Sequence, residues 1–344
     1  MIYYYVYPSA FQNPGGGEVL LLKSKEYIER TGMKIALFNM WQDRLSASDI
    51  LHVFGSVEEA LGLMRAAKAT GAKIVHSPII WYDWSSSIGI DYDLKERVIC
   101  FLRQLAKSFF PFVPSGRKKM MQLADLVLAS SKMEGKQIHR YFLIPENRIR
   151  VVPYGTDEFF AQSKPDLFVK KYALQDFVLC VGRIEPRKNQ LNLIRAMNQI
   201  DRTLVIIGDA VTHHQPYYER CVKEAKANVR FLGSLKRDSE ELKSAFSACD
   251  VFALPSWFET PGLSALEAGL AGAKIVITQG GSTREYFQDM AEYANPASVS
   301  DIKSKIETAL VSKKTDRLKN HIQAKYLWQN MAAQTIQLYQ SLNR

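Results

Sequence analysis

The sequence predicts an α/β protein built from two doubly wound, Rossmann-like domains, each with a parallel sheet. Three observations support this prediction. The chain has 344 residues, more than a single hydrophobic core usually accommodates. Short apolar runs rich in β-branched residues alternate with amphipathic stretches from end to end. The alternation is present in both halves, and it is typical of parallel strands joined by right-handed helical crossovers.

The first half supplies one predicted sheet. Its strands are expected over residues 2–7, 33–38, 50–54, 72–76 and 125–130, with amphipathic helices between them over 17–31 and 57–70. Proline, glycine and polar residues then gather over 145–167, which is typical of a junction between domains.

The second half repeats the pattern without repeating the sequence. Strands are expected over 176–182, 203–208, 228–233, 250–255 and 273–278, and helices over 189–200, 216–227, 238–248 and 261–271. An apolar stripe along 315–343 predicts one or two terminal helices that dock on another part of the chain. We therefore expect domains over 1–157 and 158–320, with a C-terminal helix over 321–344 that packs back on the first domain.

Composition excludes several classes of protein. Hydrophobic residues make up 47% and charged residues 23%, as in an ordinary globular chain, and no apolar run is long enough to cross a bilayer. The N-terminus reads as a strand and not as a signal peptide, so we expect a cytoplasmic protein. The four cysteines form no CxxC pair and the histidines lack metal-ligand spacing, so no metal is expected.

The basic residues exceed the acidic ones by 45 − 35 = 10, which favours an anionic partner. No nucleic-acid-binding motif is present, so we expect no nucleic acid. The segment 99–121 mixes aromatic residues with Arg117, Lys118 and Lys119. It is either a helix followed by a solvated basic turn or a patch that binds anionic membrane from the cytoplasmic side.

Unusual residues collect where the predicted strands end. Gly15-Gly16-Gly17-Glu18 follows the first strand, and His76 ends the fourth. In the second half, Gly182, Gly208, Gly233 and the segment Trp257–Glu259 each follow a strand. Ligands of open α/β sheets bind beyond the carboxyl ends of the strands, so we expect a ligand cleft between the two domains.

The segment 255–269, PSWFETPGLSALEAG, gives the strongest local signal. Thr260 is expected to cap a helix that starts at Pro261, so the amides of Gly262 and Leu263 would bind a phosphate. Glu259 and Glu267 would bracket an elongated ligand. The alternative is a helix with one acid near its cap and another in solvent.

A second signal is VGRIEPRKNQ over 181–190. Gly182 permits close backbone approach, and Arg183, Arg187 and Lys188 concentrate positive charge at a strand end, where they could bind phosphates. Arg187 could equally be a surface residue. No GxGxxG is present, which argues against a dinucleotide cofactor.

These motifs resemble those of family 4 of the glycosyltransferases, which have the two-domain GT-B fold. FETPGLSALEAG is similar to the Glu–seven residues–Glu motif of retaining enzymes, and VGRIEPRKN to their Gly-Arg…Lys diphosphate motif. PGGGE, VVPYGTD and NVRFLGSL resemble further segments of the family, the second with Tyr154 in place of the usual asparagine.

The resemblance implies an acceptor-side first domain, a donor-binding second domain and a role for each matching residue. Arg183 and Lys188 would bind and stabilise the leaving diphosphate, Glu259 would contact the transferred sugar, and His76 would face that sugar. Further donor contacts would come from Gly16, Gly182, Gly208, Gly233, Leu235, Thr260, Gly262, Leu263 and Glu267.

The implied activity is transfer of a sugar, with retention, from a nucleotide-diphosphate sugar such as UDP-glucose to a glycan or lipid-linked acceptor, without a cofactor or divalent metal. The alternatives are an epimerase of GT-B-like fold, a noncatalytic nucleotide-sugar sensor and, on charge alone, a nucleic-acid-binding module.

Overall fold

The computed structural model describes residues 1–344 except 9, 13–14, 92–93, 111 and 343–344. Asn13 and Pro14, just before the predicted glycine loop, and Pro111, within the segment 99–121, therefore lie outside the described residues. The chain forms two compact units. Unit 1 combines Met1–Tyr82, Arg103–Gly155 and Tyr326–Arg344, and unit 2 combines Asp83–Leu102 and Thr156–Lys325.

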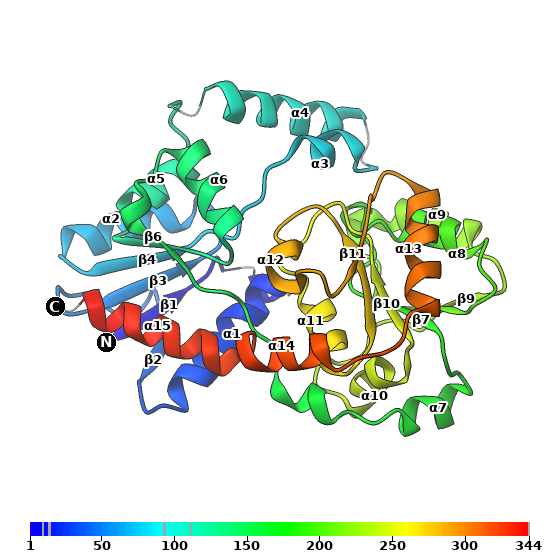
Figure 1. Ribbon diagram of the computed structural model, residues 1–344. Coiled ribbons are helices and arrows are strands. Elements are labelled where there is room, and N and C mark those ends of the chain that lie inside the picture. Colours follow the sequence, from blue (N-terminus) through cyan, green and yellow to red (C-terminus); the bar gives the residue numbers. More distant parts are fainter. Residues whose placement is uncertain (9, 13–14, 92–93, 111, 343–344) are drawn as a thin grey trace. The chain divides into compact units, whose positions relative to one another are not determined.

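Unit 1 contains a six-stranded parallel sheet in the order β2-β1-β3-β4-β5-β6 (Figure 1). Its strands are β1 (Ile2–Tyr5), β2 (Ile35–Leu37), β3 (Ile50–Phe54), β4 (Lys73–Ser77), β5 (Leu126–Ala129) and β6 (Ile149–Val151). Each neighbouring pair is parallel, with Val53 beside His76 in the β3–β4 register.

Helices cover both faces of this sheet. Its helices are α1 (Gly16–Glu29), α2 (Ala60–Ala69), α5 (Gly116–Leu123), α6 (Lys132–Phe142) and α15 (Trp328–Leu342), with short 3-10 turns at Ala10–Gln12 and Glu146–Arg148. Side chains of α2, α5 and α6, such as Met64, Met120 and Ile138, share one hydrophobic core with β3, β4 and β5. This burial explains the apolar runs of the first half.

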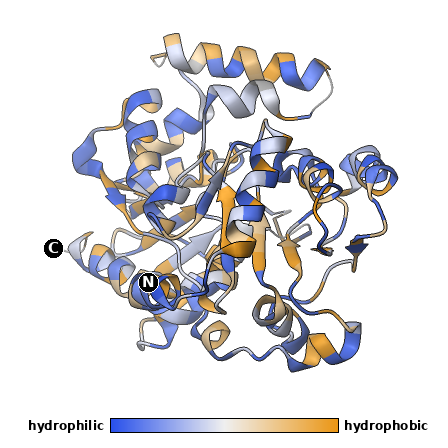
Figure 2. Ribbon diagram, turned by 45° about the vertical axis from the view of Figure 1, so that its right-hand side comes forward, coloured by the Kyte–Doolittle hydropathy of each residue, from blue (hydrophilic) through white to orange (hydrophobic). Residues whose placement is uncertain are grey.

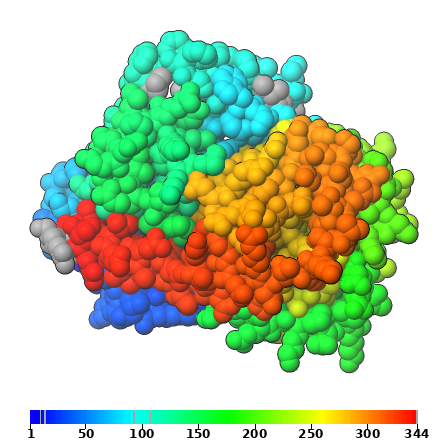
Figure 3. All heavy atoms as spheres, in the orientation of Figure 1, coloured from blue at the N-terminus to red at the C-terminus, as the bar shows by residue number. Residues whose placement is uncertain are grey.

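The C-terminal helix α15 belongs to unit 1, as the predicted fold required. It packs beside α1, and Figure 3 shows its atoms (red) next to blue atoms from the start of the chain. Its Tyr339 hydroxyl bonds to His52 Nδ1 at 2.5 Å and donates to the Tyr4 hydroxyl at 3.0 Å. The Tyr4 hydroxyl in turn bonds to Ser24 of α1, so a buried polar chain fixes the helix on the sheet.

Unit 2 contains a second six-stranded parallel sheet in the order β12-β11-β10-β7-β8-β9. Its strands are β7 (Val178–Val181), β8 (Leu204–Ile207), β9 (Val229–Phe231), β10 (Val251–Leu254), β11 (Lys274–Thr278) and β12 (Glu292–Ala294). Figure 2 shows the central strands in orange because both of their faces are buried and their residues are apolar.

The helices of unit 2 also lie on both faces of its sheet (Figure 1). They are α7 (Asp166–Tyr172), α8 (Gln190–Met197), α9 (Gln215–Glu224), α10 (Glu240–Ala248), α11 (Leu263–Leu270), α12 (Thr283–Phe287), α13 (Val299–Val311) and α14 (Arg317–Lys325), with 3-10 turns at Glu158–Gln162, Pro186–Lys188 and Thr212–His214. The short helix α3 (Trp84–Gly89) also belongs to unit 2. Helix α4 (Leu94–Phe109) crosses the division between the units.

The predicted fold class is confirmed, because each unit is a doubly wound parallel sheet. The division at 155/156 lies two residues before the expected boundary, and Asp83–Leu102 groups with unit 2 although its sequence lies in the first half. Among the described residues, no helix is both long and apolar enough to cross a bilayer.

Candidate functional site

The sheet of unit 2 creates a site between its two central strands. After β7 the chain proceeds outward through β8 and β9, and from β10 it proceeds in the other direction. The loops after β7 and β10 therefore leave on opposite sides of the sheet and expose the ends of two neighbouring strands. Lys188 lies in the loop after β7, and Glu259 lies in the loop after β10.

Lys188 and Glu259 form an ion pair at this position. Lys188 Nζ lies 2.6 Å from Glu259 Oε1, and the side chains are only 14% and 6% exposed. Arg187 lies near the same carboxylate, with its guanidinium 3.7 Å from Oε1. The Glu259 backbone is fixed as well, because its amide donates to the Gly280 carbonyl and its carbonyl accepts from the Ser282 amide.

Burial and pairing together set the pKa values of the Glu259 and Lys188 side chains. Burial alone would raise the pKa of Glu259, but the positive charges of Lys188 and Arg187 outweigh burial and hold that pKa below its usual value. Burial lowers the pKa of Lys188, and its attraction to Glu259 offsets part of this effect. Glu259 is therefore an anion at neutral pH, held in place by buried cations.

Glu185 organises the remaining cations of this loop. Its carboxylate lies 2.9 Å from the Arg187 guanidinium and 3.5 Å from that of Arg183. The Arg183 side chain is 40% exposed, so it can reach a ligand in solvent. With Lys188 and Glu259, the cluster contains three cations and two anions, a surplus of one positive charge.

Helix α11 begins beside these charges, two residues later than the sequence predicts. Gly262 is the N-cap with φ of +90°, a left-handed conformation that cannot continue a helix backward to Pro261. Thr260 is therefore not the cap. The first helical amides are those of Leu263 and Ser264, and no described backbone or side-chain atom accepts from them. They can bind an anion at the positive end of the helix.

Glu267 lies within α11 and is 3% exposed. It pairs with Arg237, which belongs to the loop after β9. Arg237 lies in none of the motifs of the sequence. Its only signal in the sequence is a basic residue shortly after the predicted strand 228–233, and 30 residues separate it from Glu267. This ion pair excludes the alternative in which Glu267 is a solvated acid.

The predicted glycines follow β7, β8 and β9. Gly208 has φ of +150°, and a Cβ at this position would lie 2.0 Å from the Gly182 carbonyl oxygen. Only glycine allows these two strand ends to approach so closely. Gly233 also has a positive φ, +68°, and precedes the partly buried Leu235. Asp209 fixes this loop, because its carboxylate accepts hydrogen bonds from the Ser234 amide and hydroxyl.

Two of the predicted residues belong to unit 1. Gly16 is the first residue of α1, whose Glu18 carboxylate accepts from the Gly15 amide at 2.7 Å. His76 is the penultimate residue of β4, one residue before the strand ends at Ser77; it is fully buried, and its Nε2 lies 2.9 Å from the Gly55 carbonyl oxygen. Burial lowers the pKa of His76 to about 4, so the imidazole is neutral at physiological pH. Its Nδ1 has no described partner.

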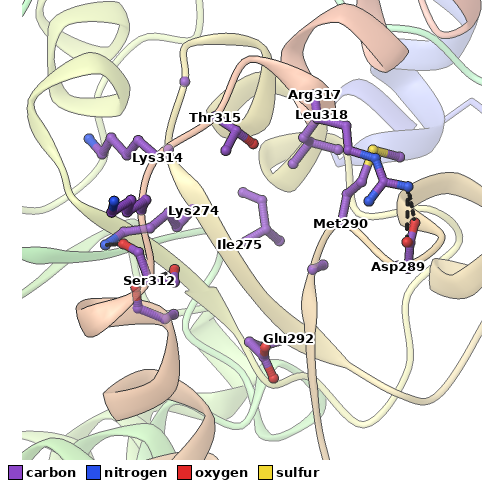
Figure 4. Close-up of a pocket in the computed structure, with 15 residues that line it drawn as sticks. Lys274, Ile275, Asp289, Met290, Glu292, Ser312, Lys314, Thr315, Arg317 and Leu318 are labelled. Atoms are coloured by element: carbon purple, nitrogen blue, oxygen red, sulfur yellow. Dashed lines mark hydrogen bonds and ion pairs between the residues drawn. The ribbon is translucent and has the colours of Figure 1, made fainter.

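The structure thus brings Arg183, Lys188 and Glu259 together with the start of α11, all in unit 2. A separate pocket in unit 2 lies at the opposite end of the sheet, where β11 begins (Figure 4). Two of its basic residues are engaged, because Lys274 pairs with Asp250 and Arg317 pairs with Asp289. Among the described residues, no group of three or more His, Cys, Asp or Glu could hold a metal ion.

Part of the chain, including this site, is similar to a known protein family. Residues 167–327 match the model of the family described as glycosyl transferases group 1. This segment includes the Lys188–Glu259 pair and the whole of α11.

Characterised and uncharacterised relatives agree with this match. The chain is 26% identical over 268 residues to the O-antigen chain mannosyltransferase B of Escherichia coli. The aligned region covers 73% of this chain and 67% of that protein. It is 26% identical over 234 residues to an uncharacterized glycosyltransferase of Methanocaldococcus jannaschii, covering 62% of this chain and 59% of that protein. Against the serotype-specific mannosyltransferase WbdA of E. coli, identity is 30% over 234 residues, with 61% and 28% covered. The aligned part of the chain thus spans between about a quarter and two thirds of the length of each of these relatives.

Solved structures share the fold over the whole chain. HepE of Anabaena, in complex with UDP-glucose, has a TM-score of 0.72 at 18% identity and covers 99% of this chain and 100% of its own. A glycosyltransferase of Rickettsia africae has a TM-score of 0.74 at 14% identity, covering 99% and 97%. At these identities the likeness establishes the GT-B fold and no more.

Proposed function

We propose that this chain, whose residues 167–327 match the group 1 glycosyl transferases, transfers a sugar from a nucleotide-diphosphate sugar to a glycan or lipid-linked saccharide, with retention of anomeric configuration. The observation that carries the proposal is the buried Lys188–Glu259 pair beside the open start of α11. The cation and the free amides at this strand-end site suit the diphosphate of such a donor. The anion beside them suits the hydroxyls of its sugar.

Departure of the diphosphate is the step that needs stabilisation. When the sugar–phosphate bond breaks, negative charge grows on the leaving oxygen and positive charge on the anomeric carbon. Lys188, Arg183 and the amides of Leu263 and Ser264 would face the first charge. Each fixed donor of this kind contributes about 2–4 kcal/mol in a site that excludes water. Because these groups supply the positive charge, we propose that no divalent metal is required.

Glu259 would serve the other side of the bond. Its lowered pKa keeps it anionic, so it can accept hydrogen bonds from sugar hydroxyls and favour the positive charge that grows on the ring. Glu267 would accept from the ribose diol, and Arg237 would keep that carboxylate oriented. Gly208, Gly233 and Leu235 follow the neighbouring strands, where they would contact the nucleoside.

UDP-glucose is the proposed donor, and GDP-mannose is its main competitor. The Anabaena neighbour was solved with UDP-glucose, whereas several relatives are named as mannosyltransferases. Thermal shifts against UDP-, GDP- and ADP-sugars would separate these donors. A shift with GDP-mannose and none with UDP-glucose would refute the UDP assignment without affecting the transfer proposal.

The transfer proposal is tested by measuring nucleotide release and product formation in the presence of saccharide acceptors and EDTA. Glu259→Gln should abolish transfer with the fold intact, whereas Lys171→Ala, which breaks an exposed ion pair with Glu241, should leave it unchanged. Conversion of the donor sugar without an acceptor would instead indicate an epimerase. The anomeric coupling constant of the product tests retention.

A further inference from the structure

Trp257 lies in the loop after β10, two residues before Glu259, and is almost completely buried at 6% exposure. Buried indole N–H groups usually find a hydrogen-bond partner, but Nε1 of Trp257 has none among the described residues. The ring is therefore fixed by packing and not by a hydrogen bond. Because the backbone of Trp257 leads directly to Glu259, the contacts that fix this ring also bear on the carboxylate.

The Trp257 ring packs against helix α3. A Cβ at Gly89, the last residue of α3, would lie 2.1 Å from both Cζ3 and Cη2 of the indole. Any larger side chain at this position would overlap the ring, so only glycine allows the approach. Gly89 and Trp257 both belong to unit 2, although Gly89 comes from the first half of the sequence.

Asp83 caps α3 at its other end. The Asp83 carboxylate accepts hydrogen bonds from the Ser86 amide at 2.7 Å and from the hydroxyls of Ser85 and Ser86 at 2.6 and 2.7 Å. Such a cap stabilises the first turn of a helix. Just after α3, Asp91 pairs with Arg220 of α9 at 2.8 Å, with both side chains about half exposed. Exposed pairs contribute little stability, so this pair adds only a weak second attachment to unit 2.

Two neighbouring strand-end loops hold the backbone around Trp257. Its amide donates to the Arg187 carbonyl at 2.9 Å, in the loop after β7. In the loop after β11, a Cβ at Gly280 would lie 2.4 Å from the Trp257 carbonyl oxygen, and the Gly280 carbonyl accepts from the Glu259 amide at 3.3 Å. Such close packing transmits strain, so a shift of the ring would be passed to the backbone that carries Glu259.

We propose that Trp257 is a positioning residue for Glu259, and that α3 holds Trp257 in place through its contact at Gly89. The first half of the sequence thereby contributes to the geometry of the site in unit 2. This inference rests on the proposed function, because it concerns the carboxylate that would contact the transferred sugar. It gives Trp257 and Gly89 no contact with the diphosphate, so the sugar-transfer step and nucleotide binding should respond differently.

Gly89→Ala tests the contact with the smallest possible change. Alanine is the better helix former, but its methyl group would overlap the Trp257 ring, so the ring or α3 must move. A misplacement of about 1 Å can cost roughly 100-fold in rate, so we expect kcat for transfer to fall on this scale. The matched control is Gly62→Ala, at a helical position with no atom within 4 Å of the added methyl group.

Nucleotide affinity, measured by calorimetry on the same variants, separates positioning from folding. The panel is UDP, GDP and ADP, and kcat is measured with the donor that the thermal shifts select. The dissociation constant of the bound nucleoside diphosphate should change by no more than about twofold in Gly89→Ala, as for groups that do not interact. A defect in folding alone would lower the melting temperature and leave kcat per folded molecule unchanged.

Trp257→Phe tests whether Gly89 acts through the indole. The smaller ring leaves space beside Gly89, so this variant alone should lower kcat with nucleotide affinity unchanged. In the Trp257→Phe background, Gly89→Ala should then lower kcat by less than about threefold, because the added methyl group no longer meets the larger ring. An equal loss of kcat in both backgrounds would show that Gly89 acts independently of Trp257.

Asp83→Ala loosens α3 without altering the contact itself. Loss of the cap frays the helix, so kcat should fall in the same direction as in Gly89→Ala, again with nucleotide affinity unchanged. Its control is Ser298→Ala, which removes the N-cap of α13, another helix of unit 2, and should leave kcat unchanged. This variant keeps the test decisive if Gly89→Ala does not fold.

The wild-type chain separates this proposal from the proposed function. A wild type that transfers no sugar would refute the proposed function, and the positioning role with it. Three results with an active wild type would refute the positioning role alone. They are a kcat in Gly89→Ala and Asp83→Ala equal to that of their controls, an equal loss in both Trp257 backgrounds, and a loss of nucleotide affinity parallel to the loss of kcat.

Discussion

Removing Lys188 tests whether the cation at the carboxyl end of β7 acts on the donor or only on the fold. In the wild-type chain Lys188 Nζ lies 2.6 Å from Glu259 Oε1, and Glu259 is almost completely buried. Lys188→Ala leaves this carboxylate without its nearest partner. Breaking a buried ion pair costs about 3–5 kcal/mol, and we expect the lower end because Arg187 remains 3.7 Å away.

The same substitution should reduce transfer for a separate reason. A fixed cation aimed at a leaving diphosphate contributes about 2–4 kcal/mol, so kcat/KM should fall roughly 30- to 1,000-fold. Initial rates over a range of donor concentrations, which give kcat/KM, and urea unfolding, measured on the same preparation, report the two effects independently. The exposed-pair variant Lys171→Ala is the control for both measurements.

The double variant Lys188→Ala/Glu259→Gln tests the explanation of the stability loss. It removes the unpaired buried charge, so it should recover most of the unfolding free energy that Lys188→Ala loses. Its activity does not bear on Lys188, because Glu259→Gln alone is expected to abolish transfer. A loss of kcat/KM below tenfold in Lys188→Ala would refute the assignment of Lys188 to the donor.

Three further predictions concern stability. The pKa of His76 is lowered from 6.5 to about 4, so the unfolded chain binds a proton at a higher pH than the folded chain does. The free energy of unfolding should therefore fall by about 3 kcal/mol as the pH drops from 6.5 to 4. Urea titrations at several pH values should show a weaker dependence of this free energy on pH for His76→Gln. Gly208→Ala would place its Cβ 2.0 Å from a backbone oxygen and should lower the melting temperature, whereas Gly62→Ala, in an open helical position, should raise it slightly. Tyr339→Phe removes a hydroxyl with two buried partners and should cost about 1–3 kcal/mol by chemical denaturation, with no such loss expected if water replaces the hydroxyl.

The sequence was sufficient to predict the architecture because strand and helix periodicities are local. The expected strands over 50–54 and 273–278 match β3 and β11 closely, and the expected fold class is observed. The predicted start of α11 was wrong by two residues. Thr260 and Pro261 are both good starting residues, but the backbone conformation of Gly262 depends on the packing around it.

Contacts between distant segments could not be predicted from the sequence. Arg237 carries no motif, and its pairing with Glu267 depends on how the loops after β9 and β10 approach each other.

The positions of the predicted residues follow from the topology of the two sheets more than from any single motif. In unit 2 the strand order reverses between β7 and β10, which brings Lys188 and Glu259 together across 71 residues of sequence. In unit 1 the order reverses between β1 and β3. Gly16, at the start of the helix that follows β1, and Gly55, directly after β3, lie in the segments that leave these strands, and the Gly55 carbonyl oxygen is bonded to His76. Each sheet therefore exposes backbone and polar groups at its own switch point, where crossover helices leave space for a ligand. It follows that a substitution at either switch point should alter ligand binding more than an equally buried substitution at the opposite end of the same sheet.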